Sequence, residues 1–215
     1  MKKSAVLFDL DGTLLDTTDG VLESAVHAAV SLGREPLPHE MMLRFVGPPI
    51  QESFMRYYGM DEARAQEAAN RFRSYYKENA LFRAKPYVGL IETLKALSGK
   101  GIALGVATYK REDYAIQVLE HFCIAPYCKT MHGADNFNRL TKADIVETCI
   151  RELGVGRKEV VLVGDTEHDA VGAANAGVDF IGVTFGFGFK TESDVGRYPN
   201  IGCAGSLEQI EELIA

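Results

Sequence analysis

The fold of this chain of 215 residues is decided by one stretch near its start, Ser4-Ala5-Val6-Leu7-Phe8-Asp9-Leu10-Asp11-Gly12-Thr13. Residues 4–8 form a continuous apolar run, which is typical of a strand buried in a parallel sheet. Two acidic residues, Asp9 and Asp11, stand where that strand ends, and Gly12 follows them. The stretch therefore predicts a buried strand whose carboxyl end carries two carboxylates.

Similar apolar runs recur at residues 102–107, 160–163 and 178–183, and segments with helical spacing separate them. Strands that alternate with helices of about 10 to 15 residues indicate right-handed crossovers and a parallel sheet. We therefore expect an α/β fold with a doubly wound parallel sheet. The Gly-rich stretch 184–198 is expected to form the most mobile loop of this core.

The segment between the first strand and the second has helical spacing throughout and contains no convincing strand. A connection of that length is expected to be an inserted helical-bundle cap domain. Its expected place is the carboxyl edge of the sheet, where open α/β sheets bind their ligands. The predicted domains are a core of residues 1–16 and 84–215 and a cap of residues 17–83.

The acidic pair after the first strand is costly to place without a partner. Two carboxylates so close repel each other unless a cation neutralises them or one becomes protonated. Phosphoryl transfer has a use for both: one attacks phosphorus, the other moves a proton, and a metal ion screens the pair and the phosphate. A simple turn is the competing interpretation, because Asp-Gly is a common turn pair.

Further polar residues fall at the ends of the later strands or just after them. Thr108 closes the second core strand, Lys142 begins a helix, and Asp165 and Asp169 lie one helical turn apart after the strand at 160–163. Each has an ordinary alternative: a structural threonine, a solvated lysine, and an acidic helix cap. Their common place at one edge of the sheet nevertheless predicts a single pocket.

Composition narrows the classes of function. The formal net charge of −7 argues against a general affinity for nucleic acid or anionic lipid. An acidic protein that binds phosphate is expected to bind Mg²⁺ as well, because the metal ion reverses the sign of the electric field in an acidic pocket. The apolar run at the N-terminus is too short for a signal peptide, and no stretch approaches the ~20 apolar residues that span a bilayer, so a cytoplasmic protein is expected. The four cysteines are expected to be buried thiols.

These motifs, in this order, strongly resemble the haloacid dehalogenase superfamily, in its phosphatase branch with a helical cap. The resemblance spans essentially the whole chain. The matching segments are Asp9-Leu10-Asp11-Gly12-Thr13-Leu14 with Asp16, then Thr108, then Lys142, then Gly164-Asp165-Thr166 through Asp169.

The resemblance implies a phosphatase that forms an aspartyl-phosphate on Asp9, with Asp11 as the acid that protonates the leaving group and then activates water. Thr108 and Lys142 would bind the phosphoryl group. The implied metal ion is Mg²⁺, and its implied ligands are Asp9, the Asp11 backbone carbonyl, Asp165 and Asp169.

Within this superfamily the chain looks closest to the group that is similar to phosphoglycolate phosphatases and nucleotidases. That resemblance rests on Arg44-Phe45-Val46-Gly47-Pro48-Pro49, which is similar to a cap substrate loop. It implies small phosphomonoester substrates and a monomer or homodimer, with substrate-binding roles for Gly12, Tyr109, Arg44 and Gly47. Tyr109 departs from the Asn or Ser of many relatives. The segment 185–189 resembles a loop of close relatives, but its ligand stays open.

The same residues also suggest alternatives to the phosphatase. A dehalogenase on this fold has no need of Asp11 or Asp165. A sugar-phosphate mutase shares every core residue and differs in what the cap admits. A phospho-acceptor of the receiver type also gathers acidic residues, a threonine and a lysine at one edge of its sheet. Its acceptor lies on a middle strand, however, and a receiver is a small domain that does not contain an inserted cap.

Overall fold

The computed structural model describes residues 3–137 and 139–214. The chain divides into two compact units, each described here by itself. One unit contains Met1–Asp16 and Pro86–Ala215, and the other is Thr17–Lys85. A short two-stranded sheet of β2 (Leu15–Asp16) and β3 (Lys85–Pro86) lies where the chain passes between them.

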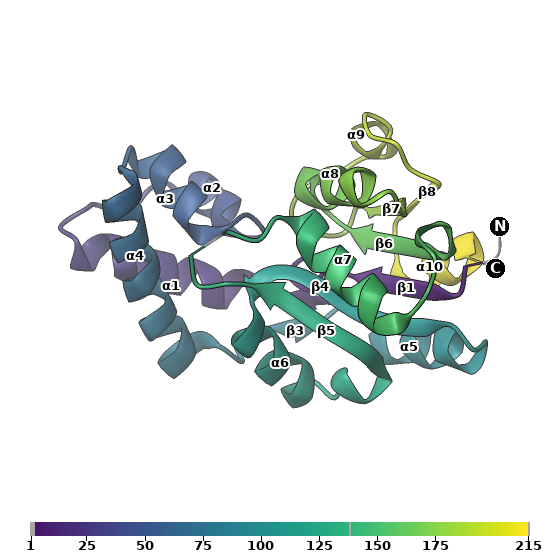
Figure 1. The fold of residues 1–215 in the computed structure, drawn as a ribbon. Coiled ribbons are helices and arrows are strands. Elements are labelled where there is room, and N and C mark those ends of the chain that lie inside the picture. The colour runs from purple at the N-terminus through teal and green to yellow at the C-terminus, as the bar shows by residue number, and fades with distance from the viewer. Residues whose placement is uncertain (1–2, 138, 215) are drawn as a thin grey trace. The chain divides into compact units, whose positions relative to one another are not determined.

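The first unit is built on a six-stranded sheet in the order β5-β4-β1-β6-β7-β8, with every neighbouring pair parallel (Figure 1). Its strands are β1 (Ala5–Phe8), β4 (Ala103–Arg111), β5 (Cys128–Ala134), β6 (Val160–Gly164), β7 (Asp179–Val183) and β8 (Gly202–Ala204). The strand with the deciding motif, β1, is central and fully buried, as its apolar sequence predicts. The α/β fold with a parallel sheet is confirmed.

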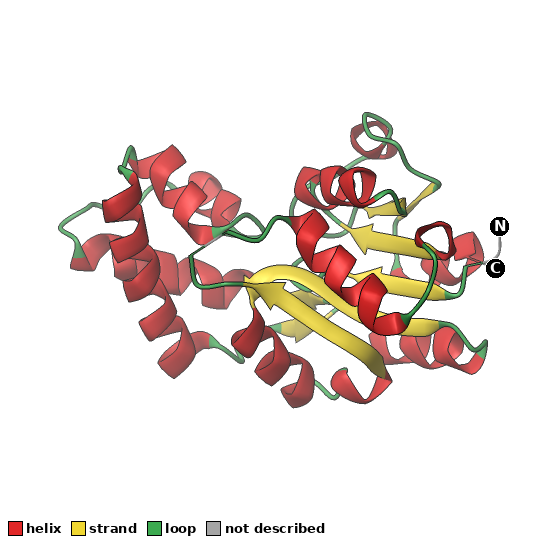
Figure 2. Cartoon of the chain, in the orientation of Figure 1, coloured by secondary structure: helices red, strands yellow, loops and turns green. Residues whose placement is uncertain are grey.

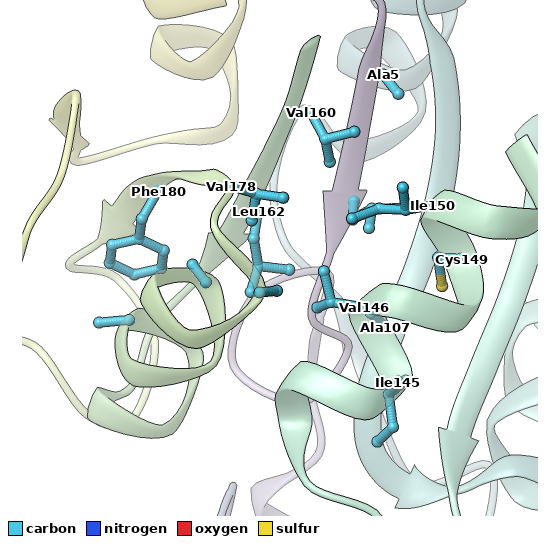
Figure 3. Close-up of a cluster of buried hydrophobic side chains, with 14 of the residues drawn as sticks. Ala5, Ala107, Ile145, Val146, Cys149, Ile150, Val160, Leu162, Val178 and Phe180 are labelled. Carbon is cyan, nitrogen blue, oxygen red and sulfur yellow. The ribbon is translucent and has the colours of Figure 1, made fainter. Parts of the chain in front are cut away.

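Helices flank this sheet (Figure 2). They are α5 (Leu90–Gly99), α6 (Glu112–His121), α7 (Lys142–Leu153), α8 (Glu167–Ala176), α9 (Glu192–Val195) and α10 (Leu207–Ile214), with short 3-10 turns η3 (Ala125–Tyr127) and η4 (Arg157–Glu159). Helices α7 and α8 pack against each other, and α5 packs against α10. Figure 3 shows part of the buried core, in which Val146 and Ile150 of α7 belong to the same cluster as Val160 and Leu162 of β6.

The second unit is helical, as residues 17–83 were predicted to be. Its elements are α1 (Thr18–Ser31), α2 (His39–Met42), η1 (Leu43–Phe45), α3 (Ile50–Tyr58), α4 (Glu62–Tyr75) and the π-helix η2 (Tyr76–Ala80). Helix α4 packs on α1 and on α3. Fully buried alanines on α1 and α4 allow close contact; they are Ala25, Ala28, Ala29, Ala65, Ala68 and Ala69.

Some features differ from the expectations. The edge strands β5 and β8 were not predicted, because neither has a continuous apolar run. The four cysteines are free thiols, but Cys149 is buried whereas Cys123 is exposed, so the expectation of buried thiols is wrong for Cys123. Over the described residues, no helix combines the length and the apolar character needed to cross a membrane.

Candidate active site at the carboxyl edge of the sheet

The first unit places the predicted core residues along one edge of its sheet. Asp9 directly follows β1, and Asp165 directly follows β6. Because β1 pairs in parallel with both β6 and β4, the carboxyl ends of these strands come together. Thr108 is buried on β4, which continues past it to Arg111 through a register shift, so Thr108 does not close the strand as expected.

Lys142 joins two of the predicted carboxylates. Its ammonium lies 2.7 Å from Asp9 Oδ1 and 2.6 Å from Asp169 Oδ1, and only 2% of the side chain is exposed. The lysine begins α7, whose N-terminus is capped by Thr141 together with Asp144. An ammonium in this position is not a solvated lysine, which was the ordinary alternative. It is a buried cation that two carboxylates hold in place.

Burial shifts the pKa values of these groups. Removal from water raises the pKa of Asp9 to about 6; the Lys142 charge opposes that shift, and the nearby Asp169 adds to it. Removal from water also raises the pKa of Asp165 to about 8, reinforced by Asp169 and Asp9. For Lys142, burial acts to lower the pKa, but the charges of Asp169 and Asp9 outweigh it, so the pKa rises. The lysine is therefore charged. Its one positive charge does not offset burial and the repulsion among the carboxylates, so the pKa values of Asp9 and Asp165 stay raised.

The three carboxylates form a group that could hold a metal ion. Asp9, Asp165 and Asp169 are all buried, and their ligand oxygens lie within 4.8 Å of one another. With Asp11 added, the site contains four carboxylates and the two ammonium groups of Lys142 and Lys110, which leaves a formal charge of −2. A divalent cation that prefers oxygen ligands fits both this donor set and this charge.

Asp11 has a partner that the sequence interpretation missed. The Lys110 ammonium lies 2.9 Å from Asp11 Oδ1 and 2.8 Å from Oδ2, and both side chains are largely buried. Lys110 follows Thr108 by two residues, the spacing that predicts a common face in a regular strand, and that signal could have found it. Both oxygens of Asp11 are thus held by one cation.

Gly12 lies close against the neighbouring carboxylate. Its φ is +87°, a left-handed value that favours glycine. A side chain there would also overlap the carboxylate of Asp165. Position 12 therefore requires glycine both for its backbone and for the space that Asp165 occupies.

Tyr109 and Thr108 make local contacts. The Tyr109 hydroxyl accepts the backbone N–H of Lys142 at 2.9 Å, and its ring meets His168 edge to face. The hydroxyl oxygen of Thr108 accepts the backbone N–H of Lys110 at 3.1 Å. The Tyr109 side chain thus supports the start of α7, a contact that the sequence did not suggest.

The predicted substrate residues of the cap lie in the second unit. Arg44 is exposed on η1, and Gly47 follows with a φ of +101°. Beneath them Phe45 is buried edge to face against Phe54, with ring centroids 5.3 Å apart. Their binding roles stay predictions.

Comparison with known proteins gives consistent results. The family model described as haloacid dehalogenase-like hydrolase matches residues 6–183. A 5'-nucleotidase from Pseudomonas aeruginosa is 36% identical over 188 residues, which cover 87% of this chain and 85% of the nucleotidase. A phosphoglycolate phosphatase from Agrobacterium fabrum is 34% identical over 187 residues, which cover 84% of this chain and 80% of that enzyme.

Two further similarities extend over both units. A protein from Mycobacterium tuberculosis named tyrosine-protein kinase PtkA is 32% identical over 211 residues, which cover 97% of this chain and 72% of the kinase. Among solved structures, one described as a predicted phosphatase from Clostridium acetobutylicum is 32% identical with a TM-score of 0.92. It covers 100% of this chain, which in turn covers 99% of it.

Proposed function

This chain belongs to the haloacid dehalogenase-like hydrolases, as its motifs predict, and we propose that it is a Mg²⁺-dependent phosphatase that hydrolyses small phosphomonoesters through an aspartyl-phosphate on Asp9. The observation that carries the proposal is the buried contact of Asp9 with Lys142, beside the carboxylates of Asp165 and Asp169. A nucleophilic carboxylate needs a fixed orientation and nearby positive charge. Lys142 supplies the orientation and one positive charge, and a metal ion would supply the remaining positive charge.

Each side chain has a role in this mechanism. Lys142 holds one oxygen of Asp9, so that the carboxylate is oriented for attack on phosphorus. The attack forms the bond from Asp9 to phosphorus as the bond from phosphorus to the leaving oxygen breaks. Asp11, whose orientation Lys110 fixes, takes up a proton before the attack, gives it to that oxygen, and later takes one from the water that hydrolyses the aspartyl-phosphate.

The proposed metal site uses the buried acidic group. Asp9, Asp165, Asp169 and the backbone carbonyl of Asp11 would hold Mg²⁺, which when bound would balance the charge of the carboxylates and the phosphoryl oxygens. Thr108, the backbone N–H of Tyr109 and Gly12 are proposed to contact the phosphoryl group.

Release of inorganic phosphate tests this proposal. Purified protein with Mg²⁺ should turn over p-nitrophenyl phosphate many times, and a chelator should stop the reaction. A screen of phosphoglycolate, nucleoside monophosphates and sugar phosphates would then find the preferred substrate. A single equivalent of product would instead indicate a phospho-acceptor, and an isomerised hexose phosphate without free phosphate would indicate a mutase.

The similarity to a protein named a tyrosine kinase favours one second candidate, phosphoryl transfer to a protein tyrosine. Incubation with labelled ATP and a tyrosine peptide would detect it. Hydrolysis of phosphomonoesters without label in the peptide supports the phosphatase, whereas label in the peptide without hydrolysis contradicts it.

Mg²⁺ is expected to raise the unfolding temperature far more at pH 8 than at pH 5. Both raised pKa values, about 6 for Asp9 and about 8 for Asp165, lie above the ordinary carboxyl value of about 4. The two groups therefore stabilise the metal-free fold below about pH 4, and that contribution is lost as the pH rises through about 6 and about 8. Metal binding must displace these protons, so Mg²⁺ affinity rises by roughly tenfold per pH unit for each proton.

Thermal unfolding at both pH values, with and without Mg²⁺, measures this effect. Asp61→Asn is the control, because it removes an exposed carboxylate that caps α4 and should leave the dependence unchanged. Equal stabilisation by Mg²⁺ at pH 5 and pH 8 would contradict the prediction.

Arg44→Ala is expected to raise KM for the preferred substrate by roughly tenfold or more, the loss expected when a charged hydrogen-bond donor is removed. KM for an aryl phosphate that lacks the group recognised by Arg44 should change little. Steady-state kinetics with both substrates measures the difference, and Arg64→Ala, at an exposed position on α4, is the matched control. A similar change for both substrates would remove Arg44 from substrate recognition.

A further inference from the structure

The segment Phe185-Gly186-Phe187-Gly188-Phe189, here called the 185–189 loop, has no part in the mechanism above. It follows β7, which pairs in parallel with β6 through Val163 with Ile181 and Gly164 with Gly182. Adjacent parallel strands end at the same edge, so the loop after β7 comes to lie beside Asp165, the residue after β6.

The loop donates three backbone N–H groups to Asp165. Those of Phe187 and Gly188 both reach the carboxylate oxygen Oδ2, at 2.6 Å and 3.1 Å. That of Phe189 reaches the backbone carbonyl of Asp165 at 2.7 Å. The loop therefore holds both the side chain and the backbone of this completely buried residue.

The two oxygens of this carboxylate are used differently. Oδ2 accepts two N–H groups, which is about the capacity of one carboxylate oxygen. Oδ1 accepts one long hydrogen bond, at 3.4 Å, from the hydroxyl of Thr13. Oδ1 is thus the oxygen with room for a further strong interaction.

Gly186 sets the distance between the loop and the carboxylate. A side chain at this position would overlap both the carbonyl oxygen of Gly12 and the carboxylate of Asp165. The backbone of Gly186 is not in the left-handed region, so the requirement for glycine is one of space alone.

Both ends of the loop are anchored. The Phe185 ring packs edge to face on Tyr87, with centroids 4.8 Å apart, and the buried Phe189 ring packs near Phe180. The ammonium of Lys190 donates to the carbonyl of Gly186. A loop held in this way can keep its N–H groups directed at one carboxylate oxygen.

We propose that the 185–189 loop is a positioning element for Asp165, which fixes Oδ2 through backbone N–H groups so that Oδ1 is presented to the bound cation. The proposal rests on the role assigned to Asp165 in the proposed function. Partners of metal ligands typically change metal affinity by about 10- to 100-fold when they are altered. Gly186→Ala should therefore weaken Mg²⁺ binding by about that factor.

Calorimetric titration of the metal-free full chain with Mg²⁺ tests the proposal without an activity assay. Gly186→Ala should lose affinity, whereas two controls should stay within about twofold of the wild type, well below the effect expected for a partner of a metal ligand. Gly99→Ala adds a methyl group at a glycine with open space around it. Phe187→Ala removes a ring but keeps the backbone N–H that contacts Asp165.

Two additional variants make every outcome decisive. Lys190 is exposed, and Lys190→Ala removes the hydrogen bond to the Gly186 carbonyl without adding atoms to the loop. It should therefore also weaken Mg²⁺ binding. This variant decides the question if Gly186→Ala does not fold. At saturating Mg²⁺ it should retain kcat, which a general loss of structure would not allow. Wild-type affinity in Lys190→Ala and Gly186→Ala, with Mg²⁺ binding lost in Asp165→Asn, overturns the role of the loop alone. Unchanged binding in Asp165→Asn overturns the metal site as well.

Discussion

Asp9→Asn is expected to reduce phosphate release by at least roughly 10³-fold, because an amide cannot act as the nucleophile that accepts the phosphoryl group. The substitution keeps the shape of the side chain, and the amide oxygen can still accept the hydrogen bond from Lys142 that Asp9 accepts at 2.7 Å. The fold should therefore persist while turnover is lost. Phosphate release at saturating substrate and Mg²⁺ measures the effect.

Circular dichroism and thermal unfolding of the same variant separate lost chemistry from lost structure. Asp61→Asn is a matched control, since Asp61 caps α4 through its side chain and asparagine caps helices equally well. That control should keep normal activity. Near-normal turnover by Asp9→Asn would exclude the aspartyl-phosphate mechanism.

Lys142→Met is expected to destabilise the metal-free protein by roughly 3–5 kcal/mol, the usual cost of removing one partner from a buried ion pair. The ammonium of Lys142 lies within 2.7 Å of oxygens of both Asp9 and Asp169, and all three side chains are nearly inaccessible to water. Methionine fills the space but leaves both carboxylates uncompensated. The raised pKa of Lys142 keeps this stabilising contribution present throughout the neutral pH range, since it is lost only as the pH rises through that pKa.

Urea unfolding of the metal-free protein measures the free-energy difference. Lys95→Met, at an exposed position on α5, should change stability by no more than about 0.5 kcal/mol. Mg²⁺ should narrow the deficit of Lys142→Met, because it supplies positive charge to the same carboxylates. A loss below about 1 kcal/mol without metal would mean that the pair adds little to stability.

The strands that the sequence predicted and those it missed differ in one physical respect. β1, β6 and β7 are central or near-central strands with both faces covered, so their sequences are apolar except for Asp179 at the start of β7. β5 is an edge strand that carries Lys129 and His132, and His132 contacts glutamates of α6 and α7. Its mixed pattern matches neither a buried run nor a regular alternation.

The candidate site shows the same division. Asp9, Asp165 and Asp169 could be expected to meet because the carboxyl ends of parallel strands converge, and the structure does bring them together. Lys110 was missed because a lysine at the end of a strand is ordinarily expected to be solvated. The Asp11 carboxylate that fixes it lies 99 residues away along the chain.

The sequence by itself determined the α/β class of the fold, the family, and which side chains stand at the carboxyl ends of the strands, because apolar periodicity and strand ends are local properties of the chain. Only the tertiary structure decided the partners: Lys142 with Asp9, 133 residues apart, and the 185–189 loop with Asp165. A carboxylate in a sequence can pair with any cation or N–H group. Which one it meets depends on the order of strands in the sheet and on the space left by residues such as Gly186, and both exist only in the folded chain.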